Sequence, residues 1–322
     1  MGWRRDSRYQ GSRIRLPDPV LGSGEASCIH MVAEKKKNPR KLANELIMVC
    51  LVMVGLLLVW SASQRIVNFN DRQLELAEHS VKAAASEVEL LVKGYQRAVK
   101  IFTEENKSFL GKLELWPQDM ESYSLLQEKI DRYFPEHLTF TLADSGGRTL
   151  LEGFEGLVGE RCRKDIRAFS SGEGGHSIHR HQGLAGQQPH FDIMSYWQSS
   201  NSDKAVFFIS FKMNSLERIL KNTQVPGHQL MLVPRDMPGQ IDATPPVNRE
   251  TLPADGQLGA DEQRRISYSL PVPGTGWNAE ILPDNALYSQ VHRSILIQTL
   301  LVFAGFIIIS VIMRMILLDE DD

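Results

Sequence analysis

The sequence has little cysteine, with only Cys28, Cys50 and Cys162 among 322 residues. A disulfide-stapled domain needs a dense and even set of cysteines, so this chain must depend on a hydrophobic core. Cys162 has no cysteine partner in the long stretch between residues 64 and 293. We expect it to be a small buried residue, with a free thiol or an intermolecular bridge as the alternatives.

A marked excess of charge is also missing. The formal net charge is −3, and residues 64–293 hold 25 Lys/Arg and 30 Asp/Glu. A nucleic-acid surface needs clustered basic residues, which this stretch does not provide. Catalytic signatures are absent too: there is no P-loop, no Gly-x-Gly-x-x-Gly after a strand and no His-Glu-x-x-His. We therefore predict a protein that is not an enzyme and has no cofactor.

Two long apolar segments lie near the ends of the sequence. The first is apolar from Leu46 to Trp60, and the second runs from Ile295 to Leu318 with four interruptions, at Gln298, Thr299, Ser310 and Arg314. A bilayer core is crossed by about 20 predominantly apolar helical residues. With their flanks, the segments predict transmembrane helices at 42–62 and 294–318.

Charge predicts the orientation of these spans. Residues 1–41 contain ten Lys/Arg and four acids, a net of +6, whereas the tail at 319–322 is entirely acidic. Short basic flanks stay in the cytoplasm, and acids contribute little to orientation. We expect a two-pass protein of the bacterial inner membrane, with both termini cytoplasmic, a disordered basic arm at 1–41, a periplasmic domain at 63–293 and an acidic cytoplasmic tail at 319–322.

A cleaved signal peptide is the alternative for the first segment, because Ser61-Ala62-Ser63 resembles a cleavage site. Against cleavage, a helical pattern continues soon after Trp60. From Leu74 the apolar residues keep a seven-residue spacing, at Leu74, Val81, Val88, Tyr95 and Phe102 and at Ala77, Ala84, Leu91 and Ala98. This seam predicts a long helix that either pairs with a second copy in a homodimer or packs against its own domain.

The rest of the stretch mixes helices and strands. A helix is expected over Met120–Phe134, ending before Pro135, and a hairpin over Leu138–Leu151 with its turn at Asp144-Ser145-Gly146-Gly147. Further strands are expected at Phe191–Trp197, Ala205–Phe211, Gln229–Val233, Arg265–Leu270 and Trp277–Leu282, with a short helix at Ser215–Lys221. The predicted fold class is mixed α+β: an antiparallel sheet of at least five strands with the long helix along it, and with Phe140, Phe208 and Trp277 buried.

This order resembles the extracytoplasmic Cache (PAS-like) sensor domain of two-pass bacterial receptors. The resemblance rests on the long helix, on Phe140-Thr141-Leu142-Ala143-Asp144-Ser145-Gly146-Gly147-Arg148, on Phe207–Phe211 leading into Leu216–Leu220, and on Val272-Pro273-Gly274-Thr275-Gly276-Trp277 before the second span. It implies a ligand in the concavity of the sheet that shifts the membrane helices. Such receptors continue into a HAMP linker and an output module, whereas this sequence stops four residues after Leu318, so we expect the signal to pass to a separate partner.

The candidate ligand-binding residues are His190, Asp192, Tyr196 and Arg163. Strand alternation places the first three on one face. A buried Asp is costly unless it is paired, so an inward Asp192 would indicate a ligand or an Arg partner. An Arg and an Asp together suit a zwitterionic or carboxylate-bearing ligand. The alternative is that this face is the wet one, with Phe191, Ile193 and Trp197 in the core, and that the basic run around Arg163 is a solvated helix face.

No metal site is predicted, although His176, His179 and His181 are secondary candidates, with His190 and Asp192 following them. Two other functions compete with the sensor: a non-catalytic cell-envelope scaffold that binds another protein, and a membrane-anchored enzyme built around the histidines. A polar pocket in the sheet would favour the sensor, and a filled sheet with an exposed apolar patch would favour the scaffold.

Overall fold

The computed structural model describes residues 39–151, 160–172, 178, 180–181, 189–198, 204–248, 252–253 and 256–319. The predicted basic arm therefore lies almost wholly outside the described residues. The chain divides into two units, Met1–Cys50 and Leu51–Asp322. All contacts given below lie within the second unit.

One helix, α1, runs without a break from Pro39 to Glu105. No proline lies between Pro39 and Pro117, so nothing removes a backbone donor along its 67 residues. At about 1.5 Å per residue it is about 100 Å long. The other long helix is α7 (Asn285–Asp319). Both contain stretches long and apolar enough to cross a membrane, with mean hydropathies of 2.5 and 2.7 and almost no burial.

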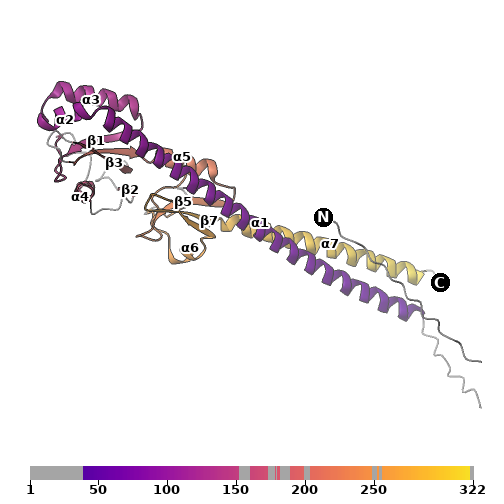
Figure 1. The fold of residues 1–322 in the computed structure, drawn as a ribbon. Helices are drawn as coiled ribbons and strands as arrows, with labels where there is room; N and C mark the ends of the chain where they lie inside the picture. Colours follow the sequence, from indigo (N-terminus) through magenta and orange to yellow (C-terminus); the bar gives the residue numbers. More distant parts are fainter. Residues whose placement is uncertain are drawn as a thin grey trace, which may run out of the picture. The chain divides into compact units, whose positions relative to one another are not determined.

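The strands divide into two antiparallel sheets, and not into the single sheet expected from the sequence. The first sheet has the order β1-β4-β3-β2 and the second β5-β7-β6. In the first sheet β4 pairs with β1 and β3, and the strands after α5 pair with one another in the second sheet. Figure 1 shows α1 passing both groups of strands. The first sheet is formed by β1 (His137–Ala143), β2 (Arg180–His181), β3 (His190–Gln198) and β4 (Lys204–Lys212), and the second by β5 (His228–Pro234), β6 (Tyr268–Pro271) and β7 (Trp277–Pro283).

Shorter helices connect and cover the sheets. The predicted helix before Pro135 is confirmed as α3, capped by Asp119, whose side chain accepts a hydrogen bond from the Ser122 amide. The predicted hairpin is confirmed at its turn, where the Asp144 amide donates to the Arg148 carbonyl. Among the described residues these short helices are α2 (Lys107–Leu115), α3 (Met120–Tyr133), α4 (Glu160–Ser170), α5 (Asn214–Thr223), a 3₁₀ turn η2 (Pro246–Asn248) and α6 (Ala260–Arg264).

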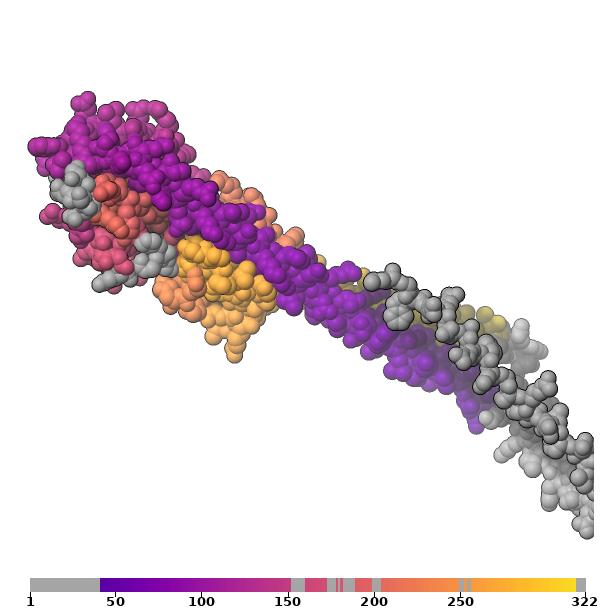
Figure 2. Space-filling view, in the orientation of Figure 1, coloured from indigo at the N-terminus to yellow at the C-terminus, as the bar shows by residue number. Residues whose placement is uncertain are grey.

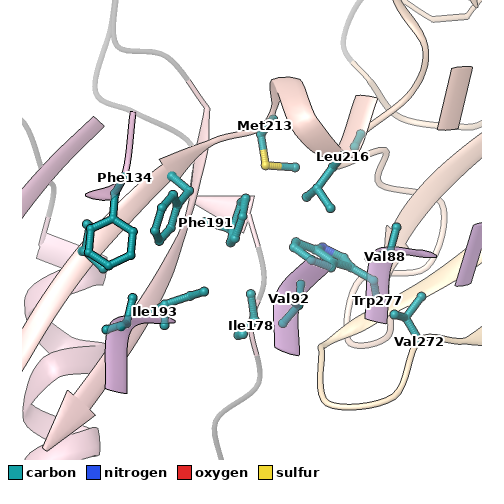
Figure 3. Close-up of a cluster of buried hydrophobic side chains, with 14 of the residues drawn as sticks. Val88, Val92, Phe134, Ile178, Phe191, Ile193, Met213, Leu216, Val272 and Trp277 are labelled. Carbon is teal, nitrogen blue, oxygen red and sulfur yellow. The ribbon is translucent and has the colours of Figure 1, made fainter. Parts of the chain in front are cut away.

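From Ala77 to Phe102 the heptad seam of α1 packs inside its own domain. Ala77, Val81, Ala84 and Val88 have no exposed surface and belong to the main core. Figure 3 places Val88 and Val92 beside Trp277, together with Leu216 and Met213. The interpretation of this seam as an intermolecular coiled coil is therefore wrong, and the homodimer stays a prediction without its support. The space-filling view shows the outer side of α1 at the surface (Figure 2).

Both faces of the first sheet are covered. Phe191 and Ile193 of β3 face the core that contains α1, while Met194 and Tyr196 pack with the side chains of α4. The predicted burial of Phe140, Phe208 and Trp277 is confirmed, at 7%, 0% and 0% exposure. The face that carries His190 and Asp192 is thus not a wet face, because α4 lies on it.

Candidate functional site

Helix α4 covers the site because one of its faces is apolar and buried, while basic residues lie on the other. Cys162, Ile166 and Phe169 are three and four residues apart and are buried against Val206 and Phe208 of β4. Three of its basic side chains, Arg161, Lys164 and Arg167, are exposed, and Arg163 is partly buried. The basic run is therefore the solvated face of a helix, and its opposite face closes the sheet.

Four chemically reactive side chains meet beneath α4, and we call them the Asp192 cluster: Cys162, His181, His190 and Asp192. The Cys162 Sγ lies 3.7 Å from the His190 Nε2. The Asp192 Oδ2 lies 3.1 Å from the His181 Nε2, and its Oδ1 lies 3.9 Å from the His190 Nε2. All four residues are buried, with exposures of 1%, 3%, 1% and 6% in the order given.

Strand pairing fixes the two histidines. His181 of β2 is the register partner of His190 of β3, and their rings stack with centroids 5.5 Å apart. Asp192 follows two residues later on the same face, where its Oδ1 accepts a 2.6 Å hydrogen bond from the Ser210 hydroxyl of β4. The Asp165 Oδ2 of α4 lies 3.4 Å from the His181 Nε2.

Burial dominates the electrostatics of the cluster. It raises the pKa of Asp192 to about 6, against the lowering effects of His190 and of the hydrogen bonds from Ser210 and Cys162. Burial also raises the pKa of the Cys162 thiol, and the neighbouring Asp192 charge raises it further. Both effects favour the neutral thiol form of Cys162.

The structure brings together two of the four residues predicted to bind ligand. His190 and Asp192 belong to the cluster. Tyr196 shares their face, but its hydroxyl donates to the Phe169 carbonyl and its ring stacks on Phe169 at 4.2 Å. Arg163 lies on α4 with its side chain partly buried, and among the described contacts none joins it to Asp192. Of the secondary metal candidates, His181 is in the cluster, while His176 and His179 lie outside the described residues.

Sequence reasoning missed Cys162 and Asp165 as members of the site. The expectation that Cys162 is a small buried residue is confirmed, but the contact with His190 spans 28 residues. The only available signal was the spacing of Cys162, Ile166 and Phe169, which marks a buried helix face. That spacing says nothing about which strand the face covers.

A cavity with a mixed polar and apolar lining adjoins the strand that carries His181. It has a volume of about 280 Å³, and its lining includes opposite charges from Arg180, Glu217 and Asp242 as well as Thr244. Because side chains alternate along β2, Arg180 lines this cavity while its neighbour His181 enters the Asp192 cluster.

Strand β2 and Ile178, which precedes it, connect the first sheet to the second. The Arg180 amide donates to the Asp242 Oδ2 at 3.3 Å, and that oxygen accepts a 2.8 Å hydrogen bond from the Trp277 Nε1. Ile178 forms a parallel bridge with Thr275, and its carbonyl accepts from the Gly276 amide at 2.7 Å. These contacts all reach the beginning of β7, which is followed directly by α7.

The solved structures that match this chain include sensor and ligand-binding domains. The sensor domain of the Vibrio cholerae histidine kinase DctB is 11% identical, with 67% of this chain and 98% of that chain covered and a TM-score of 0.48. The ligand-binding domain of Mlp24 with asparagine is 13% identical, with 69% and 98% covered and a TM-score of 0.43. The ligand-binding domain of the Pseudomonas fluorescens chemoreceptor CtaA with L-serine is 15% identical, with 67% and 99% covered and a TM-score of 0.42.

All three TM-scores lie below 0.5, so these matches are similarities only, and the resemblance to Cache (PAS-like) sensor domains stays a prediction from the sequence. No protein-family model matches the chain, and no curated protein matches it in sequence. The asparagine and L-serine are ligands of those receptors, and the function of this chain is argued below from its own residues.

Proposed function

We propose that this chain is a membrane-anchored extracytoplasmic sensor that binds a small ligand and passes a signal to a separate cytoplasmic or membrane partner. The continuity of α1 supports this proposal most directly. The helix that contains the first apolar segment also places Val81, Val88 and Phe102 in the main core, to which both sheets contribute. A change in that core therefore acts on the same rigid element that would cross the membrane.

The second span has an equally direct connection. β7 ends at Pro283 and α7 begins at Asn285. Arg180 and Ile178 contact the residues around the start of β7, either directly or through Asp242. We place the ligand at His190 and Asp192, with Tyr196 and Arg163 at the margin of the site. A ligand held there would act on β2, then on β7 and α7.

Membrane topology gives the first test. The proposed boundaries are 42–62 and 294–318 for the spans and 63–293 for the exterior domain. A reporter enzyme that is active only outside the cytoplasm is expected to be active when fused near residue 200 and inactive when fused after Leu318. The opposite pattern would place the α/β domain in the cytosol and overturn the sensor.

Replacing Asp242 with alanine is expected to separate binding from transmission. The full-length protein in detergent is first screened by thermal shift against amino acids, dicarboxylates and divalent cations. With a ligand found in this way, wild-type protein should show slower hydrogen exchange in residues 277–290. Asp242→Ala should keep the thermal shift but lose most of this protection, because the Arg180 and Trp277 donors lose their shared acceptor.

Asp261→Ala is the matched control, since Asp261 is 88% exposed in its side chain and lies in α6 of the same half of the domain. It should behave as wild type. Ligand-dependent protection that persists in Asp242→Ala would contradict the proposed connection.

A cell-envelope scaffold is the second candidate function, and an exposed apolar patch favours it. Leu115, Trp116 and Met120 are 55%, 67% and 69% exposed around the turn between α2 and α3. The α4 face of the first sheet is also filled by side chains. A screen that finds no ligand would favour this candidate, with the patch as the binding surface for another protein.

A further inference from the structure

We propose that Cys162, His181, His190 and Asp192 bind one divalent transition-metal ion, with Zn²⁺ the best fit. The proposal that this metal is the sensed ligand rests on the proposed sensor function. The proposal that the four side chains bind a metal does not depend on that function.

The donor set suits zinc. Zn²⁺ takes thiolate, imidazole and carboxylate ligands and favours four of them in a tetrahedron. The cluster offers one sulfur, two imidazole nitrogens and one carboxylate. Hard cations such as Mg²⁺ and Ca²⁺ prefer all-oxygen sites, so the sulfur and the two nitrogens select against them.

Two of the distances between the proposed ligand atoms are close to those of a tetrahedral site. With Zn–S near 2.3 Å and Zn–N or Zn–O near 2.0–2.1 Å, neighbouring ligand atoms lie about 3.3–3.6 Å apart. The S···N distance from Cys162 to His190 is 3.7 Å, and the N···O distance from His181 to Asp192 is 3.1 Å. The ligand atoms of Cys162, His181 and Asp192 all lie within 4.8 Å of one another. These three residues form the core of the proposed ligand set. His190, whose Nε2 lies 3.7 Å from the Cys162 Sγ and 3.9 Å from the Asp192 Oδ1, would join it after a shift of its side chain.

The surrounding elements hold these ligands in place. The histidines are fixed by the β2–β3 pairing, Asp192 by Ser210, and Cys162 by its position on the buried face of α4. The Asp165 Oδ2 supplies a further oxygen on the α4 side, 3.4 Å from the His181 Nε2. Oxygen atoms that lie outside the ligand set but contact a ligand orient that ligand and affect the affinity for the metal.

The competing explanation is an ion pair between His181 and Asp192 that holds β2 on β3. It accounts for the 3.1 Å contact. It does not account for the thiol and the second imidazole that approach the same carboxylate. The two explanations differ in one measurable respect, because only a metal site gives a thiolate bonded to a cation.

Cobalt titration tests the site in the full-length protein. Cys28→Ser and Cys50→Ser are combined, so that Cys162 is the only thiol, and the detergent-solubilised protein is freed of metal with a chelator. We expect one Co²⁺ per chain, with intense tetrahedral visible bands and a thiolate-to-cobalt charge-transfer band. Added Zn²⁺ should displace Co²⁺ and remove both features.

Single substitutions then assign the ligands. Cys162→Ser should abolish the charge-transfer band, and His181→Gln and Asp192→Asn should each weaken binding by about 10-fold or more, since even outer partners of metal ligands are worth that much. His228→Gln is the matched control, because His228 is also buried, at 3% exposure, but lies in the second sheet. It should leave the titration unchanged. Near-ultraviolet circular dichroism checks that each variant is folded.

Absence of the charge-transfer band in the folded Cys28/Cys50 double variant, or a band that survives Cys162→Ser, would overturn the metal site in favour of the ion pair. Hydrogen exchange in residues 277–290 distinguishes a failure of the metal site from a failure of the proposed sensor function. Cobalt binding that leaves this exchange unchanged would support the metal site and contradict metal-driven signalling. A different ligand that changes the exchange, with no cobalt band, would overturn the metal site and leave the sensor intact.

Discussion

Val88→Asp is expected to unfold the α/β domain without changing its state of association. Val88 has no exposed surface and lies beside Trp277 in the main core (Figure 3). A carboxylate there would be buried among apolar side chains, which lowers the free energy of unfolding by at least about 4–5 kcal/mol. Small proteins have only about 5–15 kcal/mol of stability in total, so this loss is a large fraction of it.

The measurement is chemical denaturation of the detergent-solubilised chain, followed by near-ultraviolet circular dichroism. Leu90→Asp is the matched control, since Leu90 lies two residues away on the same helix and is 67% exposed. Its expected effect is within about 0.5 kcal/mol. If Val88→Asp stayed folded while the apparent mass fell, the seam would be intermolecular after all.

Trp277→Ala has the second-largest expected effect. Trp277 is fully buried at the start of β7, where its ring meets Phe191 with centroids 6.1 Å apart. Removing a buried aromatic side chain costs about 3–5 kcal/mol. The loss of the Nε1 donor to Asp242 leaves that buried carboxylate one hydrogen bond short, which adds about 1–3 kcal/mol.

Two further variants separate these effects. Trp277→Phe keeps most of the packing and should lose mainly the hydrogen bond to Asp242. Trp116→Ala is the surface control, because Trp116 is 67% exposed, and its change should stay within about 0.5 kcal/mol. If Trp277→Ala were no worse than Trp116→Ala, β7 would not belong to the cooperative core, and the proposed connection from Asp242 to α7 would lose its basis.

Local features of the fold could be predicted because they depend on neighbouring residues. The seven-residue spacing from Leu74, which follows soon after the apolar run at Leu46–Trp60, predicted a long helix, and α1 is that helix. Alternation over Phe191–Trp197 predicted β3 and the side chains that share its faces. The turn at Asp144–Gly147 followed from Asx and glycine chemistry, and Gly147 does adopt a positive φ of 74°.

Tertiary structure decided what covers each of these faces. A seven-residue period says that one side of α1 is buried, but an internal core and a second copy give the same period, and only the packing of Val88 beside Trp277 separates them. Likewise, alternation placed His190 and Asp192 on one face of β3 but could not say that α4 lies on it. Cys162 reaches His190 across 28 residues because α4 and β3 are folded together, and a contact between distant segments leaves no period in either one.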